Sequence, residues 1–167
     1  MDSILGRVIA GILVLLAIAG VVYLGAQAMG ANKQTNAVGD LSQVQINVKG
    51  LYANNPAGYA SLTNTVAINA QAIPADMVSG TNIIDQWGNA VTLAPLSAAS
   101  GGGFSVADAG PVPAAACVKM ATQVPGSKKI LVNSTTLTPT NGVIDAGAAA
   151  TACSSVAAGA AMTFYFN

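Results

Sequence analysis

The chain has 167 residues and no net formal charge, with 53% hydrophobic and only 7% charged residues. This length suits one modest domain plus an additional element. The neutral balance argues against nucleic-acid binding, which requires a basic stripe, and the sparse charge argues against a highly soluble cytosolic protein. The sequence contains no histidine, the commonest general base and metal ligand. We therefore expect no enzymatic activity, no cofactor and no metal site.

The first predicted element is an apolar segment at residues 8–29, which carries no charge. As a helix it would span about 33 Å, enough for the core of a bilayer. We expect it to be retained, because it lacks the short apolar core and small-residue cleavage site of a signal peptide. Gly11, Gly20 and Gly25 would let copies of this helix pack closely, with local unwinding over residues 20–30.

An amphipathic stretch follows without an intervening proline. Its apolar residues recur at spacings of three or four and predict one apolar helix face: Val38, Leu41, Val44, Val48 and Leu51. We predict one long helix over residues 1–54, in which residues 1–30 form a membrane or filament core and residues 31–54 pack on a head. A membrane anchor followed by an unrelated helix is the alternative.

Residues 55–167 are predicted to form the globular head. A short helix within residues 63–78 should end at Pro74, and Pro95 should end the first strand. Further loops are expected at residues 97–103 and 133–142. Strands are expected at residues 90–94, 103–106, 129–132 and 162–167, and a second helix at residues 114–121. The fold class is therefore α+β, with the long helix against a small, mostly antiparallel sheet.

A tight turn is predicted at residues 86–89, directly before the first strand. Asp85 and Trp87 bracket this turn, and Gly88 follows them. We interpret all three residues as structural parts of the head, with the Trp87 indole packed beneath the long helix.

Cys117 and Cys153 are the only cysteines and lie 36 positions apart. No CxxC or His–Cys grouping accompanies them, so a zinc or redox site has little support. Two cysteines in a chain that looks exported most often form one disulfide, worth roughly 3–4 kcal/mol in chain-entropy terms. Two buried free thiols are the alternative.

Four stretches, together with the two cysteines, resemble a known family. They are the apolar amino-terminal segment, QVQINVKGLYANNPAGYASL, AIPADMVSGTNIIDQWGNAVTL and the terminal MTFYF. PADMVSGT followed by WGNAVT is the most specific of them. On these residues the chain resembles the type IVb pilins, and most closely the PilS-like major pilins of plasmid-encoded and enterobacterial type IV pili.

The resemblance implies an αβ-roll fold, with the region between Cys117 and Cys153 exposed on a filament. It also implies processing by a prepilin peptidase and insertion in the bacterial inner membrane. Inner-membrane pilus assembly machinery would then stack the subunit into a helical homopolymer with its helices inside. The sequence starts without a basic leader, so we expect the mature form, with the processed amine, methylated or not, on Met1.

The sequence departs from the family at its fifth position, where type IV pilins usually carry Glu and this chain has Leu5. Asp2 is the nearest carboxylate, and Arg7 precedes the apolar run. Because an unpaired charge inside a filament is costly, we predict that Asp2 pairs with Arg7 or with the terminal amine of an adjacent subunit. Alternatively, both charges mark the membrane interface before assembly.

The expected function is that of the major subunit of a type IVb pilus, an extracellular filament for attachment, aggregation or conjugative cell contact. A minor pilin or a secretion-system pseudopilin is one alternative. The calcium-binding head of a major pseudopilin is not evident, because no dense acidic loop surrounds Asp85 and Asp108. A membrane-anchored periplasmic binding module is the alternative from another class.

Overall fold

The computed structural model describes residues 29–97, 102–154 and 159–167. The chain divides into two units, Met1–Lys33 and Gln34–Asn167, and the second contains the sheet. The predicted apolar segment lies outside the described residues except for Met29. So do the residues expected to act in assembly: Met1, Asp2, Arg7, Gly11, Gly20 and Gly25.

A helix, here called the N-terminal helix, occupies residues 29–52. Its buried stripe on the head consists of Ala37, Leu41, Val44, Val48 and Tyr52. The predicted face was partly wrong, since Leu51 is 43% exposed. At 3.6 residues per turn, Leu51 lies about 220° around the helix axis from Val38, the first residue of the predicted face. Tyr52, by contrast, lies only about 60° from Ala37, the first residue of the buried stripe.

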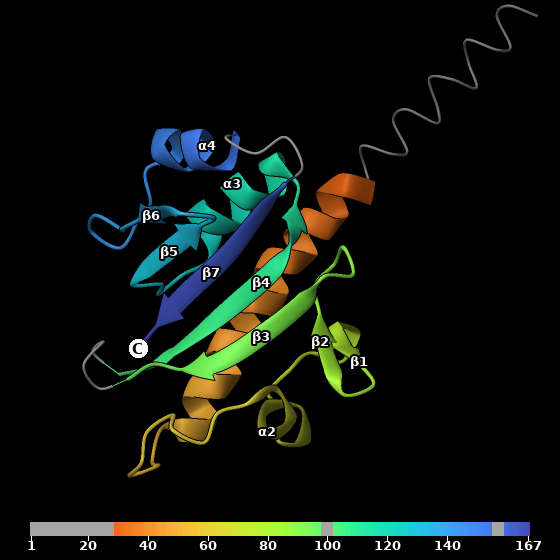
Figure 1. Cartoon of the computed structure of the whole chain (residues 1–167), viewed down its shortest axis with the longest axis vertical. Helices are drawn as coiled ribbons and strands as arrows, with labels where there is room; N and C mark the ends of the chain where they lie inside the picture. Colours follow the sequence, from red (N-terminus) through yellow and green to blue (C-terminus); the bar gives the residue numbers. More distant parts are fainter. Residues whose placement is uncertain (1–28, 98–101, 155–158) are drawn as a thin grey trace, which may run out of the picture. The chain divides into compact units, whose positions relative to one another are not determined.

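Seven antiparallel strands form one sheet in the order β1-β2-β3-β4-β7-β5-β6 (Figure 1). Their bounds are β1 Val78–Ser79, β2 Asn82–Ile84, β3 Ala90–Pro95, β4 Phe104–Val112, β5 Lys129–Val132, β6 Thr135–Leu137 and β7 Ala160–Phe166. The C-terminal strand β7 is therefore central, paired with β4 on one side and β5 on the other. This position explains its strict alternation of buried and half-buried residues.

In the described part of the chain, four helical elements follow the N-terminal helix: α2 Asn64–Asn69, η1 Ala75–Met77, α3 Ala114–Gln123 and α4 Ala146–Ser154. In Figure 1 the N-terminal helix (orange) and α3 lie across the same face of the sheet. The Lys119 ammonium of α3 donates a hydrogen bond to the Thr35 hydroxyl at 2.8 Å. The core lies between this helical layer and the sheet, and Phe104, Phe164 and Phe166 are among its fully buried side chains.

The α+β class was predicted correctly, as were β5 and the terminal strand, which begins two residues earlier than expected. The second helix was confirmed and continues to Gln123. The helix expected to reach Pro74 ends instead at Asn69, because Gln71 adopts a left-handed φ of 55°. The strand expected at residues 103–106 extends to Val112, and β1, β2, β6 and α4 were not predicted.

Candidate functional site

The turn between β2 and β3, residues 85–89, is organised by the carboxylate of Asp85. Oδ1 accepts the backbone N–H groups of Trp87 at 2.9 Å and of Asn89 at 2.6 Å, and Oδ2 accepts the Asn89 side-chain amide at 2.8 Å. Gly88 supplies a φ of +85°, a conformation that side chains with a Cβ rarely adopt. Trp87 is partly buried against the core. These contacts are local to the turn, and the packing of the Trp87 indole beneath the long helix stays a prediction.

Gln86 ties the same turn to two other elements. Its side-chain amide donates to Asp40 of the N-terminal helix at 2.7 Å and to Asp76 of η1 at 3.1 Å. Burial raises the pKa of Asp40; the bond from Gln86 opposes this shift and the nearby Asp76 charge adds to it. A neutral amide thus bridges two carboxylates.

A fourth carboxyl, that of Asp108 on β4, lies on the core side of the sheet. Its strand partners are Val91 on β3 and Met162 on β7, and it is only 5% exposed. Asp108 Oδ1 accepts the Gly110 backbone N–H at 3.1 Å, and the carboxyls of Asp108 and Asp85 line the same small cavity. Burial first, and then the charge of Asp85, raise the pKa of Asp108 to about 7.

A small cavity of about 20 Å³ lies beside these groups. Asp40, Asp85, Gln86 and Asp108 line it together with apolar side chains, among them Met120 and Phe164. A space of this size admits about one water molecule. It is too small for an organic ligand.

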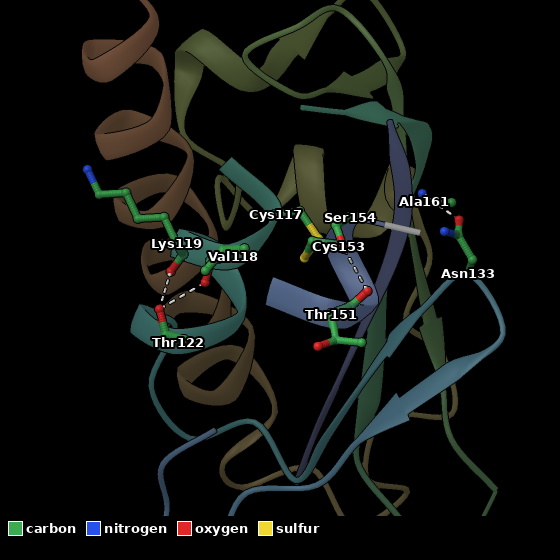
Figure 2. The surroundings of a disulfide bond; sticks show 9 residues. All are labelled: Cys117, Val118, Lys119, Thr122, Asn133, Thr151, Cys153, Ser154 and Ala161. Carbon is green, nitrogen blue, oxygen red and sulfur yellow. Dashed lines mark hydrogen bonds between the residues drawn. A yellow bond between two sulfur atoms is a disulfide. The ribbon is translucent and has the colours of Figure 1, made fainter. Parts of the chain in front are cut away.

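The disulfide joins Cys117 on α3 to Cys153 on α4, with 5.8 Å between the two Cα atoms (Figure 2). Both residues are fully buried. Beside the bridge, the Thr122 hydroxyl donates to the carbonyls of Val118 and Lys119, and the Ser154 hydroxyl donates to the Thr151 carbonyl. The bridge thus fastens α4, which packs against α3 and β6, to the helical layer over the sheet.

Exposed apolar side chains occur on the outer side of the N-terminal helix. Ile46 is 62% exposed and Leu51 43% exposed. They line a shallow groove with Gly50 and with Ala70–Gln71–Ala72, the segment after α2. No property of the sequence singled out Ile46, because its position falls outside the predicted apolar face.

The structure brings Asp85, Trp87 and Gly88 into one turn and joins Cys117 to Cys153 in another part of the head. Sequence reasoning missed that Asp40, Asp76 and Asp108 gather around the same turn. Among the residues that the structure describes, no group of three or more His, Cys, Asp or Glu is arranged to hold a metal ion. Within those same ranges, no helix combines the length and apolar character needed to cross a bilayer.

Among known protein families, the one described as PilS N terminal matches residues 31–165 of the chain. The match covers the N-terminal helix from its third residue and nearly all of the head. No curated protein and no solved structure shows a significant match to the chain.

Proposed function

Because the chain belongs to the PilS N-terminal family of type IV pilin proteins, we propose that it is the major structural subunit of a type IVb pilus. The subunits polymerise into an extracellular filament for attachment, aggregation or conjugative contact between cells. The family match over residues 31–165 is the observation that carries this proposal. In this assignment the protein acts by self-association and not by catalysis.

The apolar sequence of residues 8–29 supports polymerisation as the route to the filament. Such a segment needs an apolar environment, which lipid supplies before assembly and other copies of the segment supply afterwards. Its glycines Gly11, Gly20 and Gly25 favour close helix packing. Prepilin peptidase and the inner-membrane assembly machinery are the partners that this route requires, and Asp2 and Arg7 are proposed to pair within the assembled core.

The head supports the same proposal through its architecture. Residues 34–52 of the N-terminal helix lie across an antiparallel sheet, and the disulfide closes residues 117–153 into one region. This arrangement is what we expect of an αβ-roll head, whose disulfide-bounded region faces outward on the filament.

The test is electron microscopy of filaments sheared from intact cells, combined with mass spectrometry of their subunit. We expect thin filaments made mainly of this chain, with the mass of the disulfide-bonded form and an amino terminus at Met1. A strain that carries Cys117→Ala and Cys153→Ala provides a matched control, since its subunit should lack the two-hydrogen mass difference on reduction.

Two results would contradict the proposal. Filaments in which this chain is a trace component would indicate a minor pilin. Retention of the protein in the inner membrane without filaments would favour a pseudopilin or an anchored binding module.

A further inference from the structure

Asp108 occupies a position that apolar residues hold in the neighbouring strands. Across the sheet, Asp108 pairs with Val91 and Met162, and Met162 pairs in turn with Val132. All three of these neighbours are buried. An ionised carboxylate without a cation partner is costly in such a row, and the group tends to stay neutral instead.

Asp85 and Asp108 line the same small cavity, and Asp108 is buried. Two ionised carboxylates would repel each other there, which favours the state in which one of the two carboxyls is protonated and can donate to the other. Asp85 accepts three N–H donors from Trp87 and Asn89, and so uses both of its oxygens as acceptors. Asp108 accepts the Gly110 N–H through Oδ1. The proton therefore belongs to Asp108, which donates it to Asp85.

This hydrogen bond connects the 85–89 turn to β4. A second contact lies beside it, since a Cβ on Gly110 would overlap the Asn89 side chain. Through Gln86 the same turn reaches Asp40 and Asp76. No lysine or arginine lines the adjoining cavity, and α3 and β7 contribute Met120 and Phe164 to it, so a cation is not at hand to replace the proton.

We propose that the Asp85–Asp108 pair shares one proton and thereby acts as a pH-sensitive latch that holds the 85–89 turn against β4 and the N-terminal helix. On loss of this proton to solvent, the two facing carboxylates repel each other and the turn loosens. The inference concerns the head alone and does not depend on the proposed function.

The direction of the pH effect follows from the two states of Asp108. Its pKa is about 7 in the folded chain and returns to the ordinary value of 3.8 on unfolding. Between these values the folded chain holds one more proton than the unfolded chain. The contribution of Asp108 to stability is therefore complete below about pH 4, falls as the pH rises to about 7, and is constant above that.

Trp87 is the only tryptophan of the chain and donates its backbone N–H to Asp85, so its fluorescence reports on the latch. The experiment follows Trp87 emission and the thermal unfolding midpoint of the full chain in detergent between pH 5 and 9. For the unmodified chain we expect an emission change centred near pH 7 and a lower unfolding midpoint on its alkaline side. In Asp108→Asn, whose amide can replace the shared proton, both changes should vanish.

Two further variants locate the titrating group. Asp145→Asn changes a carboxylate that caps α4 far along the chain, and it should retain the full transition. Asp40→Asn should retain a transition near pH 7, although its midpoint can move. A transition that persists in Asp108→Asn and disappears in Asp40→Asn would overturn the proposal, as would constant emission of the unmodified chain across the range.

A measurement on the unmodified chain keeps the test independent of how the variants fold. The infrared carbonyl band of a protonated carboxyl should be present at pH 6 and lost near pH 7. Absence of that band at pH 6 would show that the pair holds no proton, and the latch would be excluded.

Discussion

Single residues in the 85–89 turn decide how the N-terminal helix, η1 and β4 are connected. Asp85 binds the turn internally, and Gln86 bonds outward to Asp40 and Asp76. Gly88 allows the backbone to adopt the φ of +85° that brings Asn89 back to Asp85. A small change at Gly88 should therefore affect several elements together.

We predict that Gly88→Ala lowers the free energy of unfolding by about 1–2 kcal/mol, the cost of a left-handed backbone at a residue with a Cβ. The space around Gly88 is open, so the effect should come from the backbone alone. Gly39→Ala is the matched control, because Gly39 is helical, exposed and equally open. That change should stabilise by about 0.5–1 kcal/mol. If thermal unfolding shows Gly88→Ala to be more stable than Gly39→Ala, the left-handed backbone at Gly88 does not limit the choice of residue there.

At the residue scale, sequence reasoning could find the turn but not the residue that it contacts. Asp85, Trp87 and Gly88 belong to a local turn pattern that the sequence shows directly. Asp108 lies 23 positions after Asp85, on a stretch where no strand was predicted beyond residue 106. Its contact with Asp85 depends on the pairing of β3 with β4, and strand pairing is set by tertiary packing and not by local preference.

At the scale of elements, α4 depends on its disulfide more than any other helix of the head. Its sequence, AGAAATACS, buries only Ala149, Ala152 and Cys153. Since hydrophobic stabilisation scales with buried apolar area, such small side chains contribute little to holding α4 in place. The same composition explains why α4 was not predicted, because nine residues of mostly alanine show no apolar stripe.

We predict that replacing Cys117 and Cys153 together by Ala lowers the free energy of unfolding by about 2–5 kcal/mol. The amides of α4 should lose hydrogen-exchange protection first, whereas those of β4 and β7 should keep theirs, because these strands pair in the centre of the sheet. Hydrogen exchange with mass spectrometry measures both regions in one experiment. Uniform loss of protection over the whole head would mean that α4 is not held separately by the bridge.

A side chain from α2 continues the sheet beyond the first residues of β2. Asn64, the first residue of α2, donates to the Val91 carbonyl at 2.8 Å and accepts the Leu93 N–H at 2.8 Å. Val91 is the last residue of β3 that pairs with β2. Its carbonyl and the Leu93 N–H therefore lie where β2 no longer covers the edge of β3. Asn64 therefore substitutes for a strand neighbour and protects an edge that could otherwise pair with another chain.

We predict that Asn64→Ala destabilises the head by about 1–3 kcal/mol, since it leaves a half-buried donor and acceptor without partners. The control is Asn69→Ala, at the exposed last residue of the same helix. Asn69→Ala should change the stability of the head only by the small difference in helix propensity between Asn and Ala. Chemical denaturation measures the free energy of unfolding of both variants. An equal decrease in the two variants would mean that the effect arises in α2 and not at the sheet edge.

Element prediction succeeded where the pattern was local and strong, as in β5 and β7. It failed for β1, β2 and β6, which have two or three residues each and exist only through pairing with neighbours. It also ended β4 at Val106, whereas the strand continues through Gly110 and Pro111 to Val112. The structure accommodates both residues in a register irregularity between Asp108 and Val112.

For the whole molecule, the central question is which part drives association between copies. Among the described residues of the head unit, the large exposed apolar side chains are few and separated along the chain: Ile46, Leu51, Val66 and Val143. A stable interface commonly buries about 800 Å² on each partner. Scattered residues of this kind are ordinary on a monomer and do not approach that area. We expect the apolar sequence of residues 8–29 to be the stronger source of association.

We therefore predict that a chain lacking residues 1–28 folds as a monomer with its disulfide intact. Its core, the antiparallel sheet and the stripe from Ala37 to Tyr52 all lie within the unit Gln34–Asn167. Light scattering after size-exclusion chromatography would give the mass, and circular dichroism would report on the sheet. Ile46→Ser in the shortened chain serves as the control for residual contacts through the groove beside Gly50. If the shortened chain forms filaments, and Ile46→Ser abolishes them, association is driven by the head and the apolar segment serves only as an anchor.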